Sequence, residues 1–143
     1  MGGITLGQAE TIIDTGFAKG AEIGCNPLSI AVLDDGGNLV AFKKQDKSSV
    51  MRFEIAFGKA WGAIGMGISS RTLGARAEER PHFMQSLTAA SGGRLVPVAG
   101  GLVIKDAKGN ALGSVGVTGD SSDNDELCAL AGIEAVGLKP GAP

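Results

Sequence analysis

The chain is 143 residues long, 43% hydrophobic, and carries a formal net charge of −2 at pH 7. This length fits one domain spanning residues 1–143, and the pI of about 5.3, with no basic stripe, argues against a nucleic-acid partner. No basic region precedes an apolar run at the N-terminus, and no apolar stretch is long enough to span a bilayer. We therefore expect a cytoplasmic protein with no membrane partner.

The first third of the chain predicts a helix followed by a β-hairpin. Thr5 can cap a helix that runs to about Glu22, with apolar residues at three- and four-residue steps. Residues 29–33 are typical of a buried strand, and residues 39–44 of its return strand. The Asp-Asp-Gly-Gly-Asn run at 34–38 is the expected turn between them.

The middle of the chain predicts three helices. The first begins near residue 48 or 49. The second begins at 69–70 and ends near 80, and the third begins at about 82, after Pro81, and ends near 90. The first carries a wide apolar stripe made of Phe53, Phe57, Trp61 and Ile64. Because this stripe is wide for one small layer, and 24 glycines favour close packing, we expect a homo-oligomer.

The last third predicts strands and one helix. In order, it contains strand-like segments at 95–98 and 102–105, a turn at 106–110, a strand at 111–118 and a helix at about 123–136. Hairpin connections make the sheet antiparallel, which indicates an α+β domain. The tail 139–143 is expected to be disordered.

The run from Gly113 to Cys128 predicts a ligand site. Its glycines leave one side of a strand bare, so that a flat ligand or a backbone can approach. We expect a pocket between this strand, the start of the last helix and the 91–94 loop, with the ligand held by Gly116, Gly119 and the guanidinium of Arg94. The acidic side chains that follow the strand could bind a cation, act as acid and base, or only stabilise the helix start. They are Asp120, Asp123, Asp125 and Glu126.

Three further residue types invite a functional interpretation. Lys59 interrupts an apolar helix, where burial would lower its pKa and suit a catalytic base, although its stem could equally line the edge of the core. His82 is the only histidine and the obvious metal ligand, for haem iron, or a helix-start residue without a metal. Cys25 and Cys128 have no CxxC spacing and are expected to be reduced.

Several segments together resemble the GlcG/HbpS family. They are Val32-Leu-Asp-Asp-Gly-Gly-Asn-Leu39, Ala56-Phe-Gly-Lys-Ala60, Arg80-Pro-His-Phe83, the run 91–104 and the run 116–126. The resemblance extends from about residue 5 to residue 136. It implies a profilin-like three-layer fold, in which helices flank a five-stranded antiparallel sheet, and it also implies a homo-oligomer.

The resemblance further implies an oligomeric protein that binds a small ligand, with haem as the candidate cofactor. One alternative is a cofactor-independent lyase or isomerase that acts on a small oxo or hydroxy acid by proton transfer. Its acid and base would be Lys59 and one of Asp120, Asp123 and Glu126. A second alternative is an accessory structural protein whose glycine faces serve subunit packing.

Overall fold

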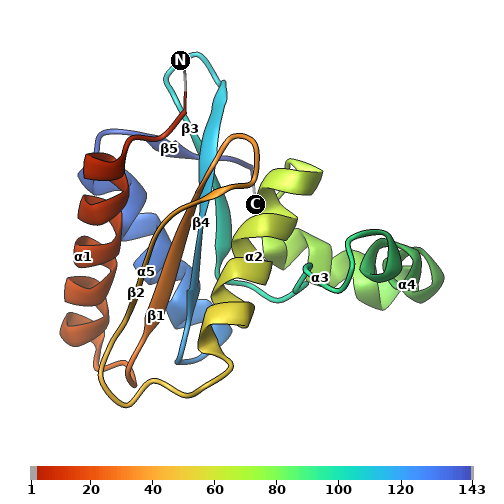
Figure 1. Ribbon diagram of the computed structural model, residues 1–143, viewed down its shortest axis with the longest axis horizontal. Coiled ribbons are helices and arrows are strands. Elements are labelled where there is room, and N and C mark those ends of the chain that lie inside the picture. Colours follow the sequence, from red (N-terminus) through yellow and green to blue (C-terminus); the bar gives the residue numbers. More distant parts are fainter. Residues whose placement is uncertain (1–2, 143) are drawn as a thin grey trace.

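A five-stranded antiparallel sheet lies at the centre of the computed structural model, which describes residues 3–142 (Figure 1). The strand order is β2-β1-β4-β3-β5. The strands are β1 (Ser29–Asp34), β2 (Leu39–Lys44), β3 (Gly101–Lys105), β4 (Ala111–Thr118) and β5 (Lys139–Pro140). Helices α1 (Leu6–Ile23) and α5 (Ser122–Ala135) cover one face, and α2 (Arg52–Met66) covers the other. The predicted three-layer α+β fold is confirmed.

Alternation along the strands divides the sheet into two different faces. Ile30 and Val32 of β1 and Val115 and Val117 of β4 pack with α1 and α5 in the main apolar core. The opposite face consists largely of small residues, including Ala31, Gly101, Ser114 and Gly116. Because these side chains are so short, α2 lies very close to the strands on this side.

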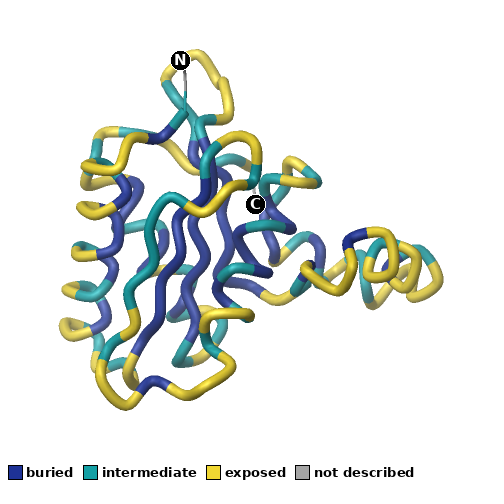
Figure 2. The backbone as a smooth tube through the Cα atoms, viewed as in Figure 1, coloured by how far each residue is buried: buried dark blue, intermediate teal, exposed yellow. Residues whose placement is uncertain are grey.

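Helices α3 (Ser70–Glu79) and α4 (Pro81–Ala90) form an arm that projects from the domain beyond α2 (Figure 1). Most buried residues lie in the sheet and on the inner faces of α1, α2 and α5, whereas α4 is largely exposed (Figure 2). Met84 is the buried residue of α4 and packs with Leu73 and Leu95. None of the helices within residues 3–142 combines the length and apolarity needed to cross a bilayer.

Local capping explains where the helices begin. The Thr5 hydroxyl accepts from Gln8 N, and the Gln8 side chain accepts from Thr5 N, which together make a capping box. Helix α2 begins at Arg52, later than the predicted residue 48 or 49. Ser48 is not a cap because its hydroxyl is buried in a 2.7 Å hydrogen bond with the hydroxyl of Ser29.

Two sequence-based expectations about the strands were wrong. Residues 95–98 form a loop rather than a strand, and Val96 N in this loop donates to the Gly58 carbonyl on α2. Residues 139–140 form β5, which pairs with β3, so this part of the tail is ordered. Gly141 N donates to Val103 O at 2.8 Å and extends that pairing, whereas residue 143 lies outside the described residues.

Candidate functional site

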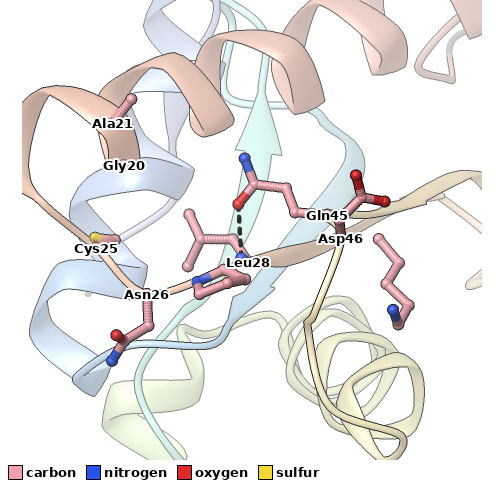
Figure 3. A pocket seen from close by; sticks show the side chains of 9 residues that line it. Gly20, Ala21, Cys25, Asn26, Leu28, Gln45 and Asp46 are labelled. Carbon is pink, nitrogen blue, oxygen red and sulfur yellow. Dashed lines mark hydrogen bonds between the residues drawn. The ribbon is translucent and has the colours of Figure 1, made fainter.

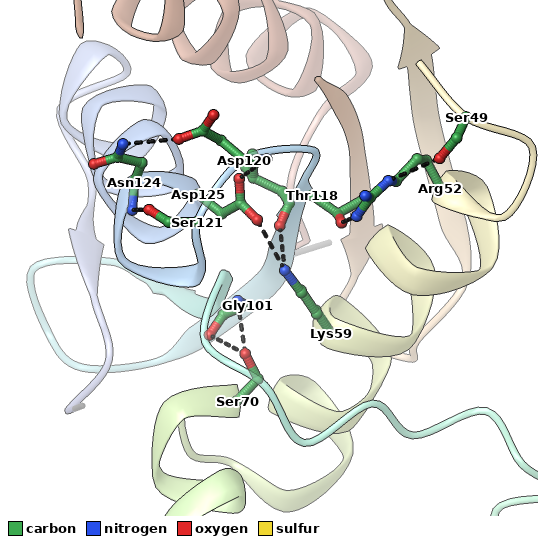
Figure 4. Close-up of polar contacts among 11 residues, drawn as sticks. Ser49, Arg52, Lys59, Ser70, Gly101, Thr118, Asp120, Ser121, Asn124 and Asp125 are labelled. Carbon is green, nitrogen blue, oxygen red and sulfur yellow. Dashed lines mark hydrogen bonds and ion pairs between the residues drawn. The ribbon is translucent and has the colours of Figure 1, made fainter. Parts of the chain in front are cut away.

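A buried ion pair joins α2 to the start of α5 (Figure 4). Lys59 Nζ donates to Val117 O at 2.9 Å and lies 3.1 Å from Asp125 Oδ2. The other carboxylate oxygen of Asp125 accepts from Asp120 N at 3.0 Å. The Lys59 and Asp125 side chains are only 3% and 2% exposed, so a substrate reaches neither of them in this conformation.

Burial of this pair disfavours the charged form of each of the two side chains. Burial lowers the pKa of Lys59, and the Asp125 carboxylate acts against that shift. Burial likewise raises the pKa of Asp125, against the attraction of Lys59. The sequence predicts a lowered pKa for Lys59 from its apolar neighbours on the helix. Its burial against β3 and β4 acts in the same direction. Its role as a base stays a prediction, because access requires that α2 separate from the sheet.

The three acidic side chains that were expected to act with Lys59 pair with other residues instead. Asp123 and Glu126 lie at the surface and pair with Arg71 of α3, with 3.1 Å between Arg71 Nε and Glu126 Oε2. The Asp120 carboxylate accepts from Asn26 N at 3.0 Å and from Asn124 Nδ2 at 2.8 Å. Asp125, which was not among the expected acid–base partners of Lys59, is the acidic residue that reaches it.

A signal in the sequence could have identified Asp125 as an inward-facing residue. The buried positions of α5 are Asp125, Cys128, Ala129, Gly132 and Ile133, which follow the spacing of one helix face. A carboxylate at the start of such an apolar face needs a buried partner. Lys59 occupies the equivalent inward position on α2, between the buried Ala56 and Ala63.

The pocket predicted on the glycine strand is not formed. A Cβ atom on Gly116 would overlap the backbone of Ala56, since α2 packs directly on this glycine. Gly119 has a φ of 143° and faces the backbone of Pro27. Arg94 lies across α2, where its carbonyl is close to Gly58 on the helix face opposite Ala56. Gly116 and Arg94 therefore do not converge on one ligand.

Arg94 packs on an aromatic ring instead of forming the wall of that pocket. Its guanidinium carbon lies 4.3 Å from the ring centroid of Trp61, and its Nε donates to Ser91 O at 2.8 Å. Beside it is a small apolar pocket of about 150 Å³ between α2 and the arm. This volume is below the roughly 300 Å³ of a usual ligand pocket. The lining residues are Trp61, Gly65, Met66, Leu87, Ala90, Ser91 and Leu95.

His82 lies in the first turn of α4, exposed on the projecting arm. Pro81 begins this helix, and within residues 3–142 no side chain caps its start, so its first N–H groups can donate to an external partner. The Arg80 guanidinium carbon lies 4.8 Å from the ring centroid of Phe83, which holds a cation beside the histidine. In the described part of the chain, no group of three or more His, Cys, Asp and Glu side chains is arranged to hold a metal ion.

A larger cleft opens between the end of α1 and the end of β2 (Figure 3). Its volume is about 610 Å³, and it is lined by Gly20, Ala21, Cys25, Asn26, Pro27, Leu28, Lys44, Gln45 and Asp46. Hydrogen bonds from Leu28 N to Gln45 Oε1 and from Gln45 N to Leu28 O join its two walls. Sequence reasoning missed this cleft because its walls come from separate segments that carry no shared motif.

A family model described as haem degrading protein HbpS-like matches residues 4–134. The chain belongs to the HbpS-like family. An uncharacterised 15.0 kDa protein from the dhaT-dhaS intergenic region of Citrobacter freundii is 28% identical over 131 residues, which are 92% of this chain and 90% of that protein.

Two solved structures illustrate the shared fold. HbpS is 27% identical, with a TM-score of 0.81 over 94% of this chain and 91% of HbpS. A complex of PduOC with haem is 18% identical, with a TM-score of 0.86 over 97% of this chain and 99% of PduOC. The second likeness concerns the fold alone.

Proposed function

We propose that this protein binds haem non-covalently and that His82 would hold the iron. The family model is named for haem degradation, and PduOC was crystallised with haem, which makes haem the leading small ligand for this chain. The observation that carries the assignment to His82 is its exposure next to a helix start that lacks a side-chain cap within residues 3–142. Bound haem would supply an iron centre for redox or oxygen chemistry.

The groups around His82 fit part of a haem. An imidazole is a common axial ligand, and the Arg80 guanidinium with the free N–H groups of α4 suits a propionate carboxylate. Arg94 is less suited to this role because it is occupied by Trp61 and Ser91. Because the arm projects from the domain, we propose that a second copy of the chain would complete the site (Figure 1).

Haem titration of matched variants tests this assignment. We expect the wild type to develop a saturable Soret band, and His82→Ala to shift the band and weaken binding by at least about tenfold, the effect of losing roughly 1.4 kcal/mol. Gln85→Ala, which changes an exposed residue one turn later on α4, is the control and should bind as the wild type does. Equal spectra and affinities for the wild type and His82→Ala would remove His82 from the site.

The proton-transfer enzyme is the second candidate. It is supported by the opposed pKa shifts of Lys59 and Asp125, since buried ionisable pairs of this kind are common at active sites. Turnover of a small oxo or hydroxy acid that persists in His82→Ala and disappears in Lys59→Met, measured per folded molecule, would favour this candidate. The accessory structural role would remain if the wild type neither bound haem nor turned over such acids.

A further inference from the structure

The two cysteines, which are 103 positions apart in the chain, meet beside Gly20 of α1. A Cβ atom on Gly20 would lie 3.6 Å from Cys25 Cβ and 3.7 Å from Cys128 Sγ. Both cysteines thus contact the same point, where α1 packs closely against α5. Each thiol also shifts the pKa of the other, as expected of neighbouring sulfur atoms. Both are free thiols in this structure.

The two thiols differ in their access to solvent. Cys25 is partly exposed and lines the 610 Å³ cleft at the end of α1 (Figure 3). Cys128 is completely buried on the inner face of α5. A small solute in the cleft can therefore reach Cys25, whereas Cys128 is closed to solvent. Cys25 thus has the position of the thiol that a peroxide meets first, and Cys128 that of a protected resolving thiol.

We propose that Cys25 and Cys128 form a reversible intramolecular disulfide when a hydroperoxide enters the cleft. The Cys25 thiolate attacks the peroxide oxygen, breaks the O–O bond and becomes a sulfenic acid, while the peroxide is reduced. The Cys128 sulfur then attacks the Cys25 sulfur, and the hydroxyl leaves as water. With hydrogen peroxide, two thiols and one peroxide give one disulfide and two water molecules. The site is independent of His82 and of haem.

Burial, together with the neighbouring carboxylates, keeps this reaction slow at neutral pH. Burial, and after it the Asp120 carboxylate, raises the pKa of the Cys25 thiol. Asp125 acts in the same direction, and Lys44 and Asp46 are the charged residues on the other wall of the cleft. Burial raises the pKa of Cys128 to about 12, so this thiol reacts slowly with peroxide by itself. Oxidation should accelerate about tenfold per pH unit while the pH stays below the Cys25 pKa.

Mass spectrometry of haem-free protein treated with hydrogen peroxide tests the proposal. We expect the wild type to lose two hydrogen atoms, to yield a peptide that links Cys25 to Cys128, and to regain both thiols with dithiothreitol. Cys128→Ser should accumulate a Cys25 sulfenic acid that dimedone traps, and Cys25→Ser should stay unmodified. Disulfides between copies, sulfinic acid in the wild type, or no modification at all would each overturn the proposal.

The variant Asp120→Asn tests whether the negative charge of Asp120 slows the oxidation of Cys25. This variant keeps an oxygen that can accept from Asn26 N but removes the negative charge beside Cys25. It should form the disulfide several-fold faster than the wild type at pH 7. An unchanged rate would contradict the role of Asp120. The haem titration of His82→Ala is measured on a different variant, so the two tests fail independently.

Discussion

At the residue scale, the buried pair of Lys59 and Asp125 is the ion pair that joins α2 to the start of α5. The two side chains connect α2 with the β4–α5 turn, where Val117 O and Asp120 N complete their hydrogen bonds. Removing water from two charges costs several kcal/mol per ion, and these contacts offset that cost only while both partners are present. The pair should therefore tolerate joint replacement better than the loss of one member.

We expect Lys59→Met to lower the free energy of unfolding by about 3–5 kcal/mol at pH 7, because the Asp125 carboxylate is left buried without its partner. Burial already raises the pKa of Asp125, and loss of the lysine removes an opposing effect. A carboxyl group whose pKa is higher in the folded state binds its proton more tightly there. The variant should thus regain stability as the pH falls toward about 5. Urea unfolding at the two pH values measures this difference.

The double variant Lys59→Met/Asp125→Asn is the matched control for that measurement. The amide oxygen of the introduced asparagine would still accept from Asp120 N, but the side chain would carry no charge. Much of the lost stability should return, and the pH dependence should disappear. An equal loss in Lys59→Met at both pH values would mean that the defect comes from packing rather than from the unpaired carboxylate.

At the scale of elements, the close approach of α2 to the sheet determines which functions the glycine strand can perform. Gly116 of β4 lies against the α2 backbone near Ala56 and Ala60. The bare side of this strand therefore accommodates a helix and not a ligand. The candidate binding features lie instead at the rim of the domain, on the arm and in the cleft beside α1.

We expect Gly116→Ala to lower the free energy of unfolding by about 3 kcal/mol or more, because the added methyl group would overlap the α2 backbone. Gly7→Ala is the control, since a Cβ atom at Gly7 of α1 would meet no atom within 4 Å. It should raise the unfolding free energy by roughly 0.5–1 kcal/mol through helix propensity and lower chain entropy. Chemical denaturation measures the unfolding free energy of both variants. A Gly116→Ala protein as stable as the wild type would refute the close packing of α2 on β4.

At the scale of the whole molecule, an apolar patch lies at the start of α2 beside the edge strand β2. Val50 is 94% exposed, Met51 is 65% exposed and Phe53 is 37% exposed. The Phe42 ring on β2 extends this patch, with its centroid 4.9 Å from that of Phe53. An edge strand next to exposed apolar side chains is a surface that proteins usually cover.

We propose that this patch is covered by another copy of the chain, and we expect sedimentation equilibrium to give a mass that is a multiple of 14.3 kDa. Met51→Glu should dissociate the assembly, because a buried unpaired carboxylate in an interface is costly. Leu127→Glu places the same charge on an exposed leucine of α5 and should leave the assembly intact. A wild-type protein that sediments only as a 14.3 kDa species would end the proposal.

Local sequence patterns were sufficient for most of the fold. The Thr5 cap, the apolar periodicity of α1, the glycine turn before β2 and Pro81 at the start of α4 all act through residues close in the chain. Such signals do not depend on which other helix or strand each element packs against. The errors occurred where a distant contact outweighed them, as when Ser48 bonded Ser29 instead of capping α2, and when β3 ordered the tail as β5.

The sequence by itself determined the α+β class, the family resemblance and the position of the only histidine at a helix start. Tertiary structure alone decided which side chains meet: Lys59 with Asp125 rather than with Asp123 or Glu126, and Cys25 with Cys128. The physical reason is that turns and helix starts depend on neighbouring residues. Contacts between residues 66 or 103 positions apart depend instead on how α1, α2 and α5 pack on the two faces of one sheet.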